Sequence, residues 1–348
     1  MSDAVTLWVP DLLNPLRIKE ANEQLQALKL PALQSLLAKA DRFSAKKQNQ
    51  FDQANYLFHQ PKHSAYASVM ARAEIKDYDP SVFWLRVDPV QMIADRDSLV
   101  LIPGDDLAIT EAESQALLES FNEHFAIEHV SLEYAAPTRW YLRIVQPVDI
   151  QTHSLESVAY KAVNDYYPAG NAATYWRKMI NETQMLFFNH PVNESRRESG
   201  MPEINSIWIW GEGVLDSKAV VERDNAMVWS EDTYLSGLAC LSGAILASSP
   251  TSHSGFAEAK NYNDELQKMT HHLIRLDALT DDLDKMELNE WLEALKALEN
   301  NWLGPLVHAL KRKEIDSLLL DFGSGQRFHL KPKHLNRFWR FKKSLAQL

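Results

Sequence analysis

Short, near-continuous apolar runs alternate with helical patterns, and this alternation limits the chain to a mixed α/β fold. The runs that read most clearly as buried strands end at Val9, Trp210, Trp229, Leu276 and Leu320. Strands that are apolar at almost every position are typical of a parallel sheet that is covered on both faces. We therefore expect these five strands to share one parallel or mostly parallel sheet.

Other segments predict further strands and several helices. Strands are expected at residues 82–88, 99–102 and 140–145. Helices are expected from Pro31, from the capping box Thr110–Glu113, and over residues 172–188 and 237–247. Trp291, Leu295, Leu298 and Trp302 recur at helical spacing. Residues 44–62, rich in Gln, Asn and Lys, predict a solvated helix and loop.

The composition is that of a globular protein from a reducing compartment. The chain of 348 residues carries 36 Lys or Arg against 47 Asp or Glu, a formal net charge of −11, which disfavours nucleic acid and anionic membranes as partners. Its one cysteine, Cys240, permits no internal disulfide and no cysteine cluster for zinc. We find no signal peptide and no apolar run of the ~20 residues that a membrane span needs. We expect a cytoplasmic protein.

Glycine makes up only 11 of the 348 residues, about 3% where roughly 7% is average. Phosphate-cradling loops need glycine because their backbone amides must approach the ligand closely. The sequence has no Walker A loop, no G-x-S-x-G elbow and no H-E-x-x-H helix, and Gly211-Glu212-Gly213 lacks the third glycine of a dinucleotide fingerprint. The sequence therefore lacks the glycine-rich loops that a nucleotide-binding site needs.

The central part of the sequence resembles a known family. It reads Phe188-Asn-His-Pro-Val-Asn193, continues through Arg196-Arg197, and ends Ile204-Asn-Ser-Ile-Trp-Ile-Trp-Gly-Glu-Gly213. Weaker matches are Trp84-Leu-Arg-Val-Asp-Pro-Val90, Ala94-Asp-Arg-Asp97, Trp140-Tyr-Leu-Arg143, Asn181-Glu-Thr-Gln-Met-Leu186 and Arg337-Phe-Trp-Arg340. On these residues the chain resembles the bacterial RpfE-type regulatory proteins. These are themselves similar to the archaeal-type cofactor-independent phosphoglycerate mutases of the alkaline phosphatase superfamily.

This resemblance implies an α/β fold, with an alkaline-phosphatase-like core and an inserted α+β domain. The core would comprise residues 1–65 plus 204–348, and the insert would lie near residues 75–190. In that superfamily, carboxylates and histidines at the carboxyl ends of strands hold two divalent cations. An active member would therefore need Mn²⁺ or Zn²⁺ as cofactor, whereas an inactive one would need none.

The residues in the implied metal-ligand positions depart from the family's pattern. Asp11, Asp277 and Asp321 stand where ligands are expected, but acidic residues at 281–284 follow Asp277 where a histidine is expected, and Phe322 replaces the histidine after Asp321. No Ser or Thr nucleophile is recognisable in a glycine-rich turn. The resemblance therefore implies a degenerate two-metal site. The alternative is that each aspartate caps a turn or the next helix.

A small-anion site is a separate expectation. Its candidate ligands are Arg86, Asp95, Arg96, Asp97, His190, Asn193, Arg196 and Arg197. A guanidinium grips phosphate or carboxylate through two parallel hydrogen bonds, and the aspartates would offset the mutual repulsion of the arginines in the empty site. The alternative is architecture, in which Arg–Asp pairs fix a loop and the His-Pro-Val-Asn segment satisfies backbone groups. The anion site requires Arg86 and Arg96 to converge with Arg196 or Arg197.

Two further features bear on binding. His271-His272 suggests a metal, but no carboxylate stands at ligand spacing, so we favour a surface or strand-edge role. From residue 322 to 348 the chain has seven Lys or Arg and no acidic residue, with Phe338, Trp339 and Phe341 interleaved. Such a stretch can bind nucleic acid or a membrane surface. We favour docking against the acidic body of the same protein.

Three functions follow from these observations. The first is a non-catalytic or weakly catalytic relative of the phosphoglycerate mutases with a regulatory or small-anion-binding role. The second is an active metal-dependent phosphoglycerate mutase or other enzyme of phosphate esters. The third is a scaffold that binds a protein partner through its Trp-rich insert or its basic tail. Metal content separates the first two.

Overall fold

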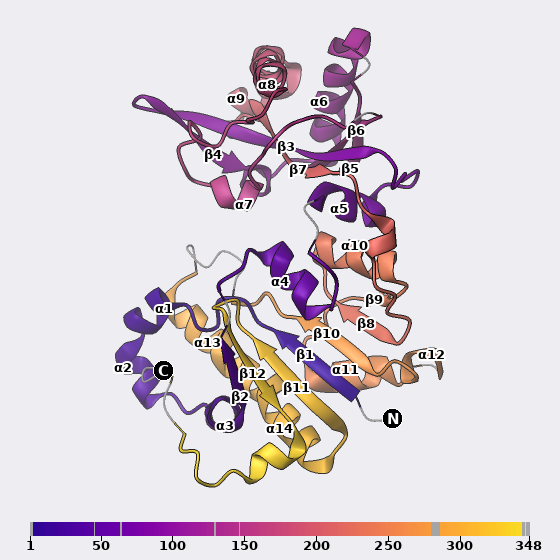
Figure 1. Ribbon diagram of the computed structural model, residues 1–348. Coiled ribbons are helices and arrows are strands. Elements are labelled where there is room, and N and C mark those ends of the chain that lie inside the picture. Colours follow the sequence, from indigo (N-terminus) through magenta and orange to yellow (C-terminus); the bar gives the residue numbers. More distant parts are fainter. Residues whose placement is uncertain are drawn as a thin grey trace. The chain divides into compact units, whose positions relative to one another are not determined.

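The computed structural model describes residues 3–44, 46–62, 65–128, 130–145, 147–262, 264–279, 286–342 and 345 (Figure 1). The chain forms two compact units. The first combines Met1–Lys62 with Val220–Leu348, and the second is the continuous segment His63–Ala219. The acidic residues expected to follow Asp277, at 281–284, lie outside the described residues.

A seven-stranded sheet forms the centre of the first unit, in the order β2-β12-β11-β1-β10-β8-β9. Its strands are β1 (Asp3–Trp8), β2 (Asp41–Ser44), β8 (Ala226–Trp229), β9 (Ile245–Ala247), β10 (His271–Arg275), β11 (Ile315–Asp321) and β12 (Gln326–Leu330). Strands β11, β1, β10, β8 and β9 run parallel, and β12 and β2 extend one edge in antiparallel pairing. The carboxyl ends of the parallel strands therefore meet at one edge of the sheet.

Four of the five strands expected in one parallel sheet are found there, namely β1, β8, β10 and β11. The prediction was wrong for the fifth. The strand that contains Trp210 is β7 (Ser206–Gly213), which pairs with β3 (Phe83–Asp95) in the antiparallel sheet of the second unit. Helices α5 (Tyr66–Glu74) and α8 (Ala173–Phe188) both contact β7, so its side chains are buried on both faces. A continuous apolar run predicts that a strand is buried on both faces, but it does not predict which sheet the strand joins.

Helices cover both faces of the sheet in the first unit. They are α1 (Pro15–Glu20), α2 (Asn22–Ala27), α3 (Pro31–Lys39), α4 (Gln50–Leu57), α10 (Thr233–Ser242), α11 (His253–Lys260), α12 (Asp264–Gln267), α13 (Leu288–Leu298) and α14 (Gly304–Arg312). Helices α3, α11, α13 and α14 bury apolar residues against one face of the sheet, in a core that includes Leu7, Leu36, Trp291 and Leu320. A π-helical turn, Glu299–Leu303, joins α13 to α14.

Two helix predictions for the first unit need correction. The segment 44–62 was expected to be solvated, but α4 buries Phe51, Gln53, Asn55 and other residues on most of its surface. Its polar side chains are buried because they bond to partners elsewhere in the unit, as Tyr234 Oη does to Asn55 over 3.0 Å. The small-residue helix expected over 237–247 ends at Gly243, whose φ of +75° closes α10 before β9 begins.

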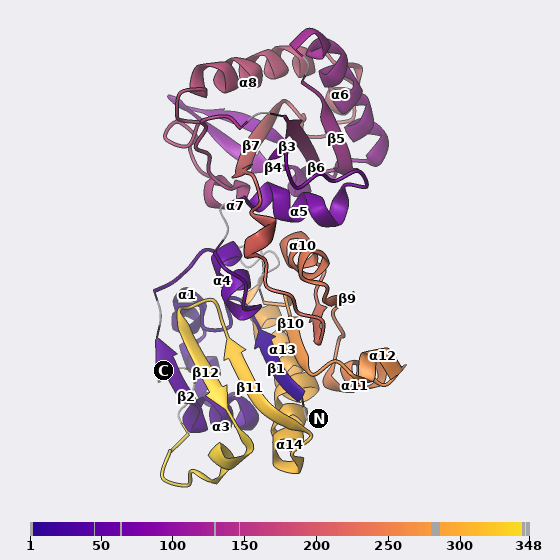
Figure 2. The ribbon, with the colours of Figure 1, turned by 45° about the vertical axis from the view of Figure 1, so that its right-hand side comes forward.

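The second unit is a five-stranded antiparallel sheet with helices on both sides. Its strands are β3, β4 (Ser98–Pro103), β5 (Leu132–Ala136), β6 (Arg139–Ile144) and β7, and its helices are α5, α6 (Glu111–His124), α7 (Leu155–Val158), α8 and α9 (Pro191–Glu198). Figure 2 shows α6 and α8 on one side of this sheet and α5 on the other. The expected capping box is present, because Thr110 and Glu113 exchange both hydrogen bonds.

Short 3-10 helices occupy Gly104–Leu107, Ala126–Glu128, Ser217–Ala219 and Pro332–Asn336. In the parts of the chain described above, no helix has both the length and the apolar character that crossing a membrane requires.

Candidate functional site

The three aspartates predicted as metal ligands gather at one edge of the first unit's sheet. Asp321 ends β11, and Asp11 and Asp277 follow β1 and β10. These strands are neighbours, and Trp8 of β1 pairs with both Asp321 and Arg275. The backbone N–H of Asp11 donates to the carbonyl of Phe322 over 3.1 Å, which ties the two strand ends together. All three aspartates therefore lie at the carboxyl ends of neighbouring parallel strands.

Asp321 is enclosed by hydrogen-bond donors. Its side chain is 1% exposed, Oδ2 accepts from Nε of Arg327 over 2.9 Å and from Nε2 of Gln53, and Oδ1 accepts from the backbone N–H of Gly323 over 2.8 Å. Burial raises the pKa of Asp321, while the bonds from Gly323 and Arg327 oppose that rise. Arg327 is itself buried and donates to Gln48 over 2.6 Å and to Gln53 over 3.2 Å. Both carboxylate oxygens are therefore already bound within the protein.

Asp277 is bound by a second arginine. Nε of Arg275 donates to Oδ1 of Asp277 over 2.7 Å, and Nη1 of Arg275 donates to Oδ2 of Asp232 over 2.6 Å. Asp232 follows β8 and caps α10 by accepting from the N–H of Leu235 over 2.8 Å. The guanidinium of Arg275 also lies 4.7 Å from the centre of the Trp8 ring. One arginine thus joins the ends of β10 and β8.

Asp11 occupies a turn with left-handed backbone. Its φ is +57°, and its carbonyl accepts from the N–H of Asn14 over 2.9 Å at the start of α1. Aspartate tolerates this conformation better than most residues because its short polar side chain bonds locally. This backbone geometry agrees with the turn interpretation of Asp11.

These residues do not fit a two-metal centre. Two divalent cations need several carboxylate or imidazole donors with free lone pairs. Here Asp321, Asp277 and Asp232 accept bonds from arginines, whose positive charge stands where metal charge would be needed. Among the described residues, no group of three or more His, Cys, Asp or Glu side chains is arranged to hold a metal ion.

Sequence reasoning missed Asp232, Arg275, Arg327 and Gln53. Asp232 carried a usable signal, since it follows shortly after the apolar run Ala226–Trp229 and directly precedes a helix. The two arginines and Gln53 carried none, because only the folded chain brings Gln53 of α4 beside Asp321 of β11, 268 positions away.

Three of the four arginines predicted as anion ligands, Arg86, Arg196 and Arg197, have protein partners in the second unit. Arg86 is 6% exposed, donates from Nε to Oδ1 of Asp88 over 2.7 Å, and lies over the rings of Tyr141 and Trp210. Asp88 also accepts from Nε1 of Trp210 over 2.6 Å. This is a closed, buried arrangement of charge and aromatic rings.

Arg196 and Arg197 belong to α9. Arg196 is 2% exposed and donates to Glu113 over 2.9 Å, to the carbonyl of Pro202 over 2.6 Å and to the carbonyl of Leu107. Arg197 pairs with Glu203 at 3.2 Å. None of the partners named for Arg86 is shared with Arg196 or Arg197 within the described residues.

Asp95, Arg96 and Asp97 form the exposed turn of the β3–β4 hairpin. Asp95 pairs with Ser98 across the turn, and Arg96 has a φ of +53°. These three consecutive residues share one exposed turn. Their partners among the predicted ligands, Arg86 and Arg196, are buried in other networks of the unit.

His190 and Asn193 shape the start of α9. Nδ1 of His190 accepts from the N–H of Val192 over 3.2 Å, its Nε2 lies 2.9 Å from Oγ of Ser120, and burial lowers its pKa. Asn193 is fully buried and exchanges bonds of 2.8 and 2.9 Å with the backbone of Ile204. These contacts agree with the architectural interpretation of the His-Pro-Val-Asn segment.

Sequence comparisons relate the chain to phosphoglycerate mutases. No protein-family model matches the chain. The chain is 25% identical over 165 residues to the 2,3-bisphosphoglycerate-independent phosphoglycerate mutase of Methanosarcina barkeri, covering 42% of each protein. It is 20% identical to that of Methanothrix thermoacetophila over 282 residues, 72% of this chain and 70% of the other. The chain spans about half the length of the Methanosarcina relatives that it matches.

Two solved structures have a fold similar to that of this chain over nearly its whole length. A protein from Pyrococcus horikoshii superposes with a TM-score of 0.62 at 14% identity, covering 99% of this chain and 92% of that one. The cofactor-independent phosphoglycerate mutase from Thermoplasma acidophilum superposes with a TM-score of 0.54 at 12% identity, covering 99% and 94%. The chain therefore has the alkaline-phosphatase-like α/β fold of the cofactor-independent phosphoglycerate mutases and is similar to them in sequence.

Proposed function

We propose that this chain is a non-catalytic or weakly catalytic relative of the cofactor-independent phosphoglycerate mutases. It would act in the cytoplasm, as an RpfE-type protein with a regulatory or small-anion-binding role. One observation carries the proposal. Asp321, at the position where the resemblance implies a metal ligand, is bound through both oxygens by Arg327, Gln53 and Gly323.

The energetics of that arrangement oppose metal binding. Breaking a buried ion pair costs roughly 3–5 kcal/mol, because one charge is left without a partner. A divalent cation at Asp321 would have to displace Arg327 and would then be repelled by it. The same reasoning applies to Arg275, which is shared by Asp277 and Asp232. The proposed role therefore requires no metal cofactor.

Metal content and activity of the purified full chain test this proposal. We expect no stoichiometric Mn²⁺ or Zn²⁺, and no interconversion of 3- and 2-phosphoglycerate with Mn²⁺, Mg²⁺, Co²⁺ or Zn²⁺ supplied in turn. Turnover near ~10 s⁻¹, an ordinary enzyme value, would overturn it if Asp321→Asn or Asp277→Asn abolished that turnover. Asp316→Asn on the exposed side of β11 is the matched control. That result would establish the active metal-dependent enzyme instead.

A second candidate, a protein-interaction scaffold, is favoured by the C-terminal tail. Arg337 donates to Asp41 over 2.6 Å and to the carbonyl of Lys39 over 2.7 Å, so this part docks on its own unit, as expected. Yet Phe338, Trp339 and Phe341 are 85%, 60% and 84% exposed. Light scattering across protein concentrations, with Trp339→Ser and Phe341→Ser as variants, tests whether these rings mediate self-association. A concentration-independent monomer in every case would leave self-association without support.

A further inference from the structure

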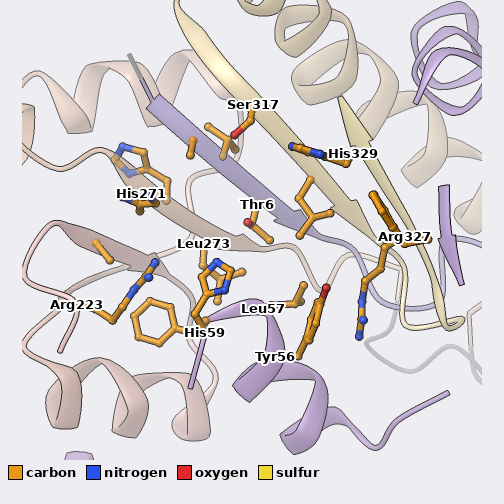
Figure 3. Close-up of a pocket in the computed structure, with 17 residues that line it drawn as sticks. Thr6, Tyr56, Leu57, His59, Arg223, His271, Leu273, Ser317, Arg327 and His329 are labelled. Atoms are coloured by element: carbon orange, nitrogen blue, oxygen red, sulfur yellow. The ribbon is translucent and has the colours of Figure 1, made fainter. Parts of the chain in front are cut away.

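A pocket of about 420 Å³ lies on the face of the first unit's sheet that is opposite the core helices (Figure 3). Strand residues alternate between the two faces. In β11 and β12, Leu318, Leu320 and Phe328 belong to the apolar core, whereas Leu319 and His329 line the pocket. The carboxyl-terminal end of α4 forms the opposite wall. The pocket therefore lies between the sheet and α4, and its volume suits a small organic molecule.

The charge of the pocket is opposite to that of the chain. Its lining includes two arginines and four histidines and contains no Asp or Glu, although the chain as a whole carries a net charge of −11. Arg327 is already paired with Asp321. Arg223, His59 and His271 lie at one end of the pocket in Figure 3, and their side chains face the same space. Three groups that can be cationic are thus held together without a carboxylate in the lining.

The guanidinium of Arg223 has a hydrogen-bond donor that the described residues leave unsatisfied. Its Nε is buried and makes no hydrogen bond within the described residues, and its guanidinium lies 5.5 Å from the centre of the Phe58 ring. A buried N–H of a charged group without a partner is costly, and such groups in native structures call for an explanation. A bound anion would give the Arg223 guanidinium the charge partner that the described residues around it do not supply.

The rest of the pocket is apolar and aromatic. Phe43, Tyr56, Phe58, Leu273 and Leu319 line it together with Thr6 and Ser317. Such walls favour a ligand with an apolar body in addition to its charged group.

We propose that this pocket binds a small organic anion, a phosphate monoester or carboxylate with an apolar body, whose charged group lies among Arg223, His59 and His271. The inference rests on the small-anion part of the proposed function and does not depend on the loss of catalysis. It places the anion site in the first unit, on residues that the sequence did not single out as anion ligands.

Proton uptake should accompany binding. The pKa of His59 is lowered by burial and by the nearby charges of Arg223 and His271, and the pKa of His271 is lowered by burial and Arg223. His272, the next residue in the chain, lies beside Lys260 and Asp3, and His329 lies near Lys331 and Asp41. Both His59 and His271 are therefore mostly neutral near pH 7. An anion favours their protonated forms, so binding tightens as the pH falls.

Calorimetric titration of the full chain tests the proposal with three probes. These are phenyl phosphate, benzoate and the uncharged benzyl alcohol. Benzoate also serves for comparing pH 6 with pH 8, because its carboxyl group stays ionised at both. We expect the two anions to bind and benzyl alcohol not to bind, with benzoate tighter at pH 6. Phosphate and carboxylate preferences are then separated by the first two probes.

Two variants assign the binding to the pocket. Arg223→Gln should weaken anion binding at least ~10-fold, the loss of one charge-assisted contact. His59→Asn removes the imidazole and keeps a residue that tolerates the φ of +56° at this position, so the fold is retained; it should reduce the difference between pH 6 and pH 8. Arg312→Gln, on an exposed arginine paired with Glu314, is the matched control and should bind like the wild type.

Three results bear on the two proposals differently. Loss of binding in Arg223→Gln but not in Arg312→Gln supports the pocket. Anion binding that is unchanged in both Arg223→Gln and His59→Asn overturns the pocket and leaves the small-anion role standing. No binding of either anion to folded wild-type protein overturns the small-anion role and the pocket together.

Discussion

Nε of Arg327 lies 2.9 Å from Oδ2 of Asp321, and both side chains are buried. The carboxyl ends of parallel strands are where α/β proteins place ligand-binding groups. At this strand end the protein supplies its own cation. The pair therefore stabilises this edge of the sheet. It joins β11 to β12, and Arg327 also bonds to Gln48, just before α4, and to Gln53 in α4.

Arg327→Met should lower the free energy of unfolding by about 3–5 kcal/mol, because Asp321 is left buried without its charge partner. The double variant Arg327→Met/Asp321→Leu should recover much of that loss. Urea denaturation followed by circular dichroism measures both. Arg312→Met, at a largely exposed pair, is the control and should change little. A single variant as stable as the wild type would contradict this account.

Stability should also depend on His272. Burial, followed by the charge of Lys260, lowers the pKa of His272 to about 3, and its Nδ1 accepts a hydrogen bond from Trp229 over 3.4 Å. Asp3 lies 3.8 Å from Nε2, but Lys260 binds the same carboxylate oxygen and offsets its attraction. The unfolded chain takes up this proton near pH 6.5, before the folded chain does. Stability from this group is thus present above pH 6.5.

As the pH falls from 6.5 toward 3, the free energy of unfolding should drop by up to ~1.4 kcal/mol per pH unit from this histidine. Urea midpoints across that range measure the slope. His272→Gln should flatten it, whereas His308→Gln on the exposed side of α14 should not. An unchanged slope in His272→Gln would show that other groups cause the dependence.

Two glycines allow a matched test of backbone packing in the second unit. Gly213 has a φ of +147°, and a Cβ there would lie 2.7 Å from Cβ and 2.9 Å from Cα of Ala65. Gly200 has a φ of +69° and open space around it. Gly200→Ala should therefore cost only the ~1–2 kcal/mol of a left-handed residue, and Gly213→Ala should cost clearly more. Thermal unfolding ranks the two, and an equal loss would refute the predicted clash.

The roles of Arg196 and Arg96 can be separated by substitution. Arg196→Gln should destabilise the protein by about 2 kcal/mol or more, since Glu113 and two carbonyls lose a buried charged donor. Arg96→Ala, in an exposed hairpin turn, should change stability by no more than ~0.5 kcal/mol. If the two arginines instead formed one anion site, added phosphate would raise the melting temperature and Arg96→Ala would abolish that rise.

Four strands of the parallel sheet were predictable because burial on both faces leaves apolar runs that end at Val9, Trp229, Leu276 and Leu320. β12 was not predicted, since Arg327 and His329 make one of its two faces polar. That face lines the pocket and pairs with Asp321, so its polarity follows from partners that the local sequence does not reveal.

The acidic half of the candidate site was predictable, and the basic half was not. An aspartate after an apolar, strand-like run indicates a strand end from sequence alone. The arginines that neutralise Asp321 and Asp277 look like any other charged residue until the sheet is assembled. Arg223 and His59 likewise come from separate segments, and only the fold places them around one space.

The position of β1 in its sheet has a consequence for how the chain folds. Ala4 pairs with His271 on one side and with Ser317 on the other, so the central strand of the first unit has both of its neighbours near the far end of the chain. Closing such long loops is slow, whereas His63–Ala219 holds its strands and helices within one continuous segment. The second unit can complete its sheet during synthesis, whereas β1 cannot pair until β10 and β11 have been synthesised. β1 precedes the other strands of its sheet in the chain and is thus among the last of them to find its partners.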